Sequence, residues 1–337
     1  MNSARNPLTG KAFFLGLFAC CAVMLMNLRA MAQDYTEDQY KAFQEIQAEQ
    51  SAIKKATLAV KFLQVPANAK CGLLKNVVAE FDTAMQGLEK AGNWPEILKL
   101  GEQFINVVPD DSYTIGLLAT GYQQEKNYKQ FVVFGEKVFA KSPNNAPLAY
   151  FMAKAYDELG NDAKFLTWGE KTVSLNPNNY EILIELAKRY SGAKRVSEAS
   201  KYANEAVKAL STAKKPENLA DAKWKEYVDQ SSAACYAIIG NAAYESKNYT
   251  VAVANLEKSV VAFKRNDIAY YFLGMSYWQM GKSDMAMLNF AKSYVLKGST
   301  SQASKTYLDQ LYKSSHANSL AGQERVVQRA KMDLGIQ

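Results

Sequence analysis

The sequence predicts an all-α solenoid, a stack of antiparallel helix pairs, from a repeat period of 34 residues. Pro109, Pro143 and Pro177 lie 34 residues apart, and each follows a helix-length segment. Three consecutive segments also align on one another without gaps: 112–145, 146–179 and 180–213. A helix pair this short cannot bury its own apolar face, so it has to stack on the next copy.

Each of these segments has the pattern of two helices joined by a turn. The first helix carries a tyrosine at one register, at Tyr122, Tyr156 and Tyr190. The second helix mixes small and large apolar residues, which lets neighbouring helices approach closely and interlock. A proline ends the second helix, and the asparagine pairs that follow Pro143 and Pro177 offer caps for the next helix.

The period is interrupted and then resumes, because Gly240 and Gly274 are again 34 residues apart. Segment 267–300 carries its apolar residues in the order Tyr270-x-x-Leu273-Gly274-x-x-Tyr277, Ala286 and Phe290. This pattern resembles the tetratricopeptide repeat family, whose signature is W-x2-L-G-x2-Y, A-x3-F and a closing proline. Segment 233–266 is similar, and 78–111 is a degenerate copy. The resemblance covers 78–300 and implies a right-handed superhelical solenoid of tetratricopeptide-type helix pairs.

We expect six segments along the chain: a signal peptide (1–32), an N-terminal helical hairpin that is a degenerate repeat or cap (33–77), repeats 1–4 (78–213), a helical insertion (214–232), repeats 5–6 (233–300) and C-terminal capping helices (301–337). In the hairpin and the C-terminal segment, apolar residues recur at helical spacing. Terminal repeats are atypical in solenoids because one of their faces meets water. The insertion carries Leu219, Trp224 and Tyr227 on a short amphipathic helix.

The N-terminus has the parts of a secretory signal peptide. Arg5 and Lys11 precede an apolar run from Ala12 to Leu28, and Ala30-Met31-Ala32 forms a small-x-small cleavage site. This pattern predicts cleavage after Ala32 and export to the periplasm or cell envelope. Two alternatives remain: a retained anchor, because about 17 apolar residues approach the length that spans a bilayer, and a lipid attached at Cys20.

Composition and charge favour a folded, soluble protein without a nucleic-acid partner. Hydrophobic residues make up 48% and charged residues 22% of the chain. The formal net charge is +7, and three of the basic residues lie in 1–32 together with no acidic residue. The remaining basic residues are interleaved with aspartate and glutamate, so no dense basic run is available to follow a phosphate backbone.

The sequence lacks the residue patterns of an enzyme. The single histidine, His316, lies in a polar connector, and no phosphate-binding loop, dinucleotide-binding glycine pattern or nucleophile elbow occurs. We therefore expect no catalytic residue, no cofactor and no metal site. Cys71 and Cys235 are expected as two separate buried thiols, because a solenoid holds distant repeats farther apart than a disulfide spans.

The resemblance also implies where a partner would bind. In the family, the first helices of successive repeats line a concave groove that holds an extended peptide or a helix. This implies nine partner-binding residues: Tyr113, Tyr150, Lys154, Lys188, Asn241, Tyr244, Tyr271, Met275 and Trp278. Aromatic rings beside lysine and asparagine suit a peptide, although such tyrosines can also serve only to pack helices together. Gly116 and Ile184 stand where a clamp for a terminal carboxylate needs polar groups.

The expected function is a non-enzymatic protein–protein interaction scaffold or adaptor of the bacterial cell envelope. It would bind a partner peptide or helix in the groove, and it would touch a membrane only through an uncleaved N-terminal segment. Two alternatives come from other classes of protein. One is a membrane-anchored structural component of the envelope that assembles by stacking. The other is an accessory subunit that handles polysaccharide or lipid.

Overall fold

The computed structural model describes residues 34–336. The predicted signal peptide, 1–32, and its cleavage site lie outside these residues. Within the described part, the chain forms sixteen α-helices and one short 3-10 helix and contains no strand. The predicted all-α fold is therefore confirmed.

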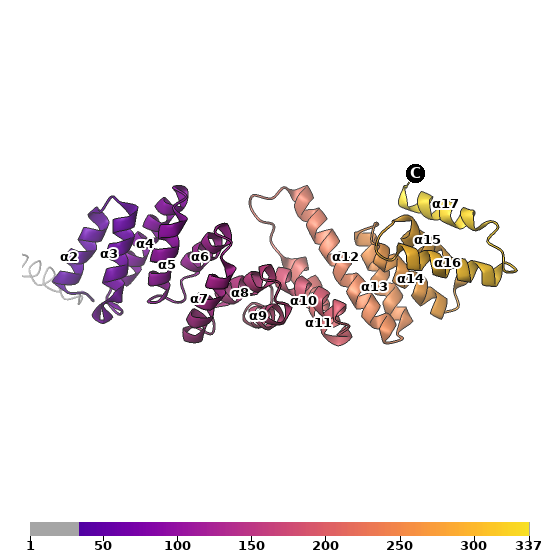
Figure 1. The fold of residues 1–337 in the computed structure, drawn as a ribbon, viewed down its shortest axis with the longest axis horizontal. Helices are drawn as coiled ribbons and strands as arrows, with labels where there is room; N and C mark the ends of the chain where they lie inside the picture. Colours follow the sequence, from indigo (N-terminus) through magenta and orange to yellow (C-terminus); the bar gives the residue numbers. More distant parts are fainter. Residues whose placement is uncertain (1–33, 337) are drawn as a thin grey trace, which may run out of the picture. The chain divides into compact units, whose positions relative to one another are not determined.

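The chain divides into two compact units, of which the first ends at Pro143 and the second begins at Asn144. The first unit contains six α-helices and the 3-10 helix: α2 (Glu37–Ala48), α3 (Ala52–Gln64), η1 (Pro66–Asn68), α4 (Leu74–Lys90), α5 (Trp94–Ile105), α6 (Ser112–Gln124) and α7 (Tyr128–Lys141). Within it, consecutive helices pack as neighbours, as the coloured ribbon of Figure 1 shows.

The second unit contains ten α-helices: α8 (Ala146–Glu158), α9 (Asp162–Leu175), α10 (Tyr180–Gly192), α11 (Val196–Thr212), α12 (Asp221–Glu245), α13 (Tyr249–Ala262), α14 (Asp267–Gln279), α15 (Ser283–Val295), α16 (Ser301–Ser315) and α17 (Gln323–Leu334). Helices α8 to α15 form four successive pairs, each with extensive packing inside the pair and against the next one. These are the tetratricopeptide-type helix pairs that the sequence predicts.

Asparagine side chains cap the first helices α8 and α10, as the asparagine pairs after Pro143 and Pro177 predict. Asn145 accepts a 2.8 Å hydrogen bond from the backbone N–H of Leu148, and Asn179 accepts one of 3.1 Å from Ile182. Each side chain satisfies one of the N–H groups that the first turn of a helix leaves unpaired. The short turn after each proline therefore passes directly into the next repeat.

Glycine allows the two helices of a pair to touch at the signature positions. At Gly240 a Cβ atom would lie 2.5 Å from Cγ of Leu256, and at Gly274 it would lie 2.6 Å from Cδ1 of Phe290. Both distances are far below van der Waals contact, so the first helix reaches the second only because a side chain is missing. The glycine of the L-G signature is thus required by helix packing.

A buried tyrosine links each of three helix pairs to the pair before it. Tyr190 on α10 donates a 2.5 Å hydrogen bond to Glu170 on α9, and Tyr277 on α14 donates one of 2.7 Å to Glu257 on α13. Tyr122 on α6 donates in the same way to Glu102 on α5. Burial, and then Glu170, raise the pKa of Tyr190 to about 12. The neutral phenol is therefore the form that the fold holds.

The segment that interrupts the period becomes part of a single long helix. Residues 213–220 form a loop, and α12 then runs without a break for 25 residues. Its buried residues begin only at Ala233. In Figure 1 the N-terminal part of α12 extends beyond the ends of α13 and α14. The insertion therefore adds an ordered helical extension, residues 221–232, that buries no residue of its own.

The last two helices both pack against α15. Leu308 and Tyr312 of α16 and Ala330 of α17 join the buried core of this end of the unit. Lys292 on α15 pairs with Asp333 on α17 at 2.8 Å, which fixes α17 in place. Exposed polar residues occupy the outer sides of both helices.

Gly274→Ala is expected to lower the free energy of unfolding by about 1–3 kcal/mol, because the new methyl group overpacks the contact with Phe290. Gly192→Ala is the matched control in the same unit, since nothing lies within 4 Å of its would-be Cβ. The control should be neutral or slightly more stable. Urea denaturation followed by circular dichroism measures both, and equal effects of the two substitutions would contradict the packing role.

Alkaline pH is expected to weaken the link between repeats. The pKa of Tyr190 rises from 10.0 to about 12 on folding, so its contribution to stability is complete below pH 10. That contribution is lost as the pH climbs through about 12. Denaturant midpoints measured between pH 9 and pH 12 should fall, and they should fall less steeply in Tyr190→Phe. Identical slopes in the two proteins would exclude this linkage.

Candidate functional site

The residues assigned to partner binding lie on first helices of the repeats. Tyr113 is on α6 in the first unit. The other eight are in the second unit, on α8, α10, α12 and α14: Tyr150, Lys154, Lys188, Asn241, Tyr244, Tyr271, Met275 and Trp278. Lys154 and Lys188 are exposed, and the other seven are partly buried. They fall into several separate environments.

Three aromatic side chains gather on the surface of the second unit, and we call them the ring cluster: Tyr180, Trp224 and Tyr227. Trp224 and Tyr227 project from the α12 extension, with ring centroids 5.6 Å apart and planes 17° apart. Tyr180, the first residue of α10, meets both edge-on at 6.0 and 6.1 Å. Tyr227 is 38% exposed, and the other two are partly buried. The cluster therefore presents aromatic surface to solvent.

Tyr150 borders the ring cluster through α10. Its hydroxyl donates a 2.7 Å hydrogen bond to Oε2 of Glu181, the residue that follows Tyr180. Burial, and then Glu181, raise the pKa of Tyr150, and Tyr180 and Tyr227 act on it in the same direction. Tyr150 is therefore neutral at physiological pH, and its hydrogen bond holds a carboxylate beside the rings.

The two predicted lysines lie on the same first helices. Lys154 is one turn after Tyr150 on α8 and is exposed. The ammonium group of Lys188 pairs with Glu185 at 2.8 Å. Exposed pairs of this kind contribute only about 0–1 kcal/mol, so Lys188 can exchange Glu185 for an acceptor on a ligand.

The predicted residues of α14, together with Tyr244, pack into the C-terminal core of the second unit. Trp278 and Tyr271 place their ring centroids 5.6 and 6.0 Å from that of Tyr307 on α16. The ring centroids of Tyr244 and Phe272 lie 5.7 Å apart, and Met275 packs against the same core. Their side chains join α12, α14 and α16, and the structure does not bring them into the ring cluster.

Asn241 lines a separate surface pocket of about 460 Å³ between α10, α11 and α12. Ser191, Lys194 and Glu245 are among the polar side chains around it. Oδ1 of Asn241 is buried and has no hydrogen-bond partner among the described residues. Lys194 and Glu245 give this pocket charges of both signs, so its charge selects no class of ligand.

Tyr113, the predicted residue of the first unit, lies among carboxylates. Its hydroxyl is shielded from solvent, and Glu89 on α4 acts on it both by charge and through a side-chain hydrogen bond. Burial comes first among the causes that raise its pKa to about 12, followed by Glu89 and Asp82 on α4 and then by Asp111. Tyr113 thus lies among acidic side chains of its own unit.

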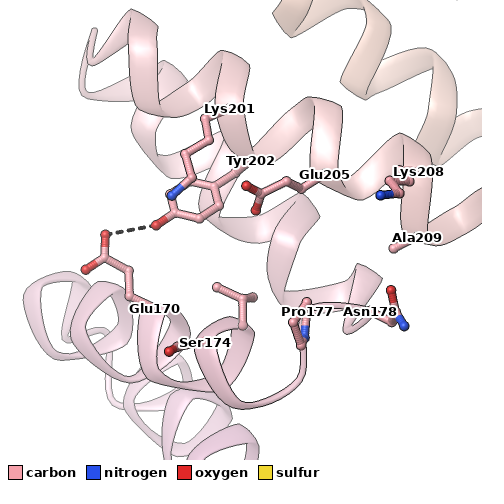
Figure 2. A pocket seen from close by; sticks show the side chains of 10 residues that line it. Glu170, Ser174, Pro177, Asn178, Lys201, Tyr202, Glu205, Lys208 and Ala209 are labelled. Atoms are coloured by element: carbon pink, nitrogen blue, oxygen red, sulfur yellow. Dashed lines mark hydrogen bonds between the residues drawn. The ribbon is translucent and has the colours of Figure 1, made fainter.

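A further pocket, of about 500 Å³, lies on the second helices α9 and α11 (Figure 2). Tyr202 donates a 3.2 Å hydrogen bond across it to Glu170, the carboxylate that also holds Tyr190. Lys201 lies over the Tyr202 ring at 4.8 Å. The best-placed polar groups of this pocket already serve the contact between repeats.

Nucleophilic and metal-binding groups do not converge in the described part of the chain. Cys71 and Cys235 are free and buried, as expected, and burial raises the pKa of Cys235 to about 12. His316 stacks on Tyr312 at 3.8 Å between ring centroids. No group of three histidine, cysteine, aspartate or glutamate residues within 34–336 is arranged to hold a metal ion.

None of the helices between residues 34 and 336 combines the length and apolar composition that crossing a bilayer requires.

The sequence predicted Tyr150 as a binding residue but did not identify the aromatic residues that lie near it. Trp224 and Tyr227 were recognised only as the apolar side of a short helix, and Tyr180 was not singled out. The signal was present, because Trp224 and Tyr227 are three residues apart and therefore share one face of a helix.

No family model and no curated protein matches this sequence. Solved structures are similar to it. A MamA protein shares 19% identity over 56% of this chain and 90% of its own, with a TM-score of 0.41. PilW, a type IV pilus biogenesis factor, shares 16% identity over 65% and 97%, with a TM-score of 0.36. Part of a TPR repeat-containing protein from Cytophaga hutchinsonii shares 12% over 74% and 92%, with a TM-score of 0.42. Because these TM-scores are below 0.5, the likenesses say nothing about what this chain binds.

Proposed function

We propose that this chain of tetratricopeptide-type helix pairs is a non-catalytic binding scaffold of the cell envelope. It holds a segment of a partner protein against the first helices of its second unit. The ring cluster supplies the contact area, and Tyr150, Glu181, Lys154 and Lys188 supply polar groups around it.

One observation carries this proposal: the α12 extension is ordered but buries none of its own residues. Residues 221–232 project past the neighbouring pair, and their two aromatic side chains meet Tyr180 at the surface. A helix that adds nothing to the core and displays tryptophan and tyrosine has the composition of a binding surface. Aromatic residues of these types dominate the energetics of protein interfaces.

The non-catalytic part of the proposal is supported by the state of the reactive side chains. The Cys235 thiol is buried, with its pKa raised to about 12, so the nucleophilic thiolate is not the form present at neutral pH. Nδ1 of His316 lies 2.9 Å from the carbonyl oxygen of Tyr312, next to the ring stack. Cys235 lies on α12 and His316 directly follows α16, and they do not form a nucleophile–base pair.

The envelope location rests on the N-terminal sequence, and it is tested by fractionating native cells and sequencing the N-terminus of the protein. A mature chain that begins at Gln33 in the soluble envelope fraction supports the proposal. An intact N-terminus in the membrane fraction would instead favour the anchored structural component. This experiment needs no knowledge of the partner.

The ring cluster is tested with Trp224→Ala/Tyr227→Ala in the full chain. We expect at least a tenfold loss of captured partner, because truncating one anchor residue of an interface commonly costs 2 kcal/mol or more. The measurement is quantitative crosslinking and pulldown from envelope extracts. The circular dichroism spectrum should stay unchanged, since neither side chain belongs to the core.

The matched control is Tyr35→Ala/Tyr40→Ala, which removes another surface pair of stacked rings, 5.6 Å apart, in the first unit. It should leave capture unchanged. Equal recovery of the same partner by both double variants would overturn the role of the ring cluster. Capture of glycan or lipid by the intact chain, with no protein, would favour the accessory-subunit alternative.

A further inference from the structure

One more pocket of the second unit is lined only by uncharged side chains, and we call it the neutral pocket. It lies between α11, α12 and α13 and has a volume of about 730 Å³. Five of its eleven lining residues are apolar, and six carry a hydroxyl or a carboxamide: Ser197, Ser200, Asn204, Ser246, Asn248 and Asn255. The pockets beside Glu170 and Asn241 both have lysine and glutamate in their walls, so the neutral pocket differs from them in chemistry.

Hydrogen bonds within the helices fix which end of two carboxamides is left for a ligand. Nδ2 of Asn204 donates to the carbonyl oxygen of Ser200 at 2.8 Å, and Nδ2 of Asn255 donates to that of Val251 at 2.9 Å. A backbone carbonyl can only accept, so the NH₂ end of each carboxamide has to face it. Oδ1 of each side chain is therefore the end that can accept a hydrogen bond from a ligand.

The other polar groups of the neutral pocket add one more acceptor and one donor. The hydroxyl of Ser246 donates to the carbonyl oxygen of Ala242 at 2.9 Å, which leaves its oxygen able to accept. Oδ1 of Asn248 accepts from the N–H of Val251 at 3.3 Å, so its NH₂ group is the end left to donate. The hydroxyls of Ser197 and Ser200 can do either. Fixed acceptors therefore outnumber fixed donors in this pocket.

The absence of charge and the excess of acceptors among the lining residues together define the class of ligand. A charged group would lose water on entering and would meet no counter-charge in the wall. A peptide backbone brings one carbonyl for each N–H, so its carbonyls would exceed the fixed donors available. A polyhydroxylated ligand brings one hydrogen for each oxygen and can turn each hydroxyl toward an acceptor. The volume lies within the range of roughly 300–1,000 Å³ that is typical of small-molecule sites.

We propose that the neutral pocket binds an uncharged saccharide. Asn204 and Asn255 accept hydrogen bonds from two of its hydroxyl groups, and Asn248 donates to a third oxygen. Val196, Ile239 and Val251 line the same pocket and contact the C–H groups of the sugar ring. This site is separate from the ring cluster and does not depend on it. A chain with both sites would join a partner protein to a carbohydrate.

The test is saturation-transfer NMR on the full chain with three neutral disaccharides as probes: maltose, lactose and N,N′-diacetylchitobiose. At least one of them should receive saturation from the protein, and N-acetyl-trialanine amide, a neutral peptide, should not. Because the lining residues carry no charge, raising the salt concentration should leave the affinity unchanged. Transfer to none of the disaccharides would overturn the proposal. Stronger binding of the peptide would assign the pocket to a protein segment and overturn the saccharide.

The repeat itself offers a matched control for Asn255. Asn289 lies 34 residues later on α15, and its Nδ2 donates to the carbonyl oxygen of Met285 at 2.8 Å in the same arrangement, outside the neutral pocket. Asn255→Ala and Asn289→Ala should both leave the denaturation midpoint unchanged or higher, because alanine is the better helix former. Only Asn255→Ala should weaken disaccharide binding, and Asn204→Ala/Asn255→Ala should weaken it at least fivefold. Equal affinities of Asn255→Ala and Asn289→Ala would overturn the proposal.

A variant that fills the neutral pocket gives an independent check. Ser197 is exposed at its edge, so Ser197→Tyr should abolish disaccharide binding without changing the circular dichroism spectrum. Unchanged binding by this variant would place the sugar elsewhere and overturn the site. Trp224→Ala/Tyr227→Ala should bind the disaccharide normally, and Asn204→Ala/Asn255→Ala should capture the protein partner normally. The saccharide site and the ring cluster can therefore fail independently.

Discussion

The hydrogen bond from a buried tyrosine to a glutamate twenty residues earlier fixes how one helix pair sits on the pair before it. At Tyr190 and Glu170 the bond joins α10 to α9, and at Tyr277 and Glu257 it joins α14 to α13. Burial makes the bond costly to break, because the glutamate and the phenol would both remain inside without a partner. The first helices α10 and α14 are therefore each held in one register on the pair before them.

The sequence predicted the repeats because the contacts that stabilise a solenoid are local. The 34-residue spacing of the prolines, the tyrosine register and the L-G pairs each describe contacts within one helix pair or between neighbours. The first and last residues of the helices were harder to predict from the sequence. Helix α4 begins at Leu74, ahead of the segment aligned from 78. Of the predicted insertion, 214–220 lie in a loop, and 221–232 belong to α12 without a break. Whether a helix continues depends on packing and loop contacts that a period does not encode.

The candidate site could be predicted only in part, for two physical reasons. Family-based positions cover the regular repeat, so they identified Tyr150 but had no counterpart for Trp224 and Tyr227 on the extension. They also could not separate a tyrosine that packs inward, such as Tyr271 beside Tyr307, from one that reaches solvent.

The α12 extension has a consequence for how the sequence of this protein can evolve. Residues elsewhere on the first helices serve both the core and the surface, so a substitution there risks unfolding. Residues 221–232 have no such role in the core, since none of them is buried. About three turns of helix can thus drift in sequence without loss of the scaffold. Sequence divergence among relatives should concentrate in this segment, and changes there can alter partner preference without altering the scaffold.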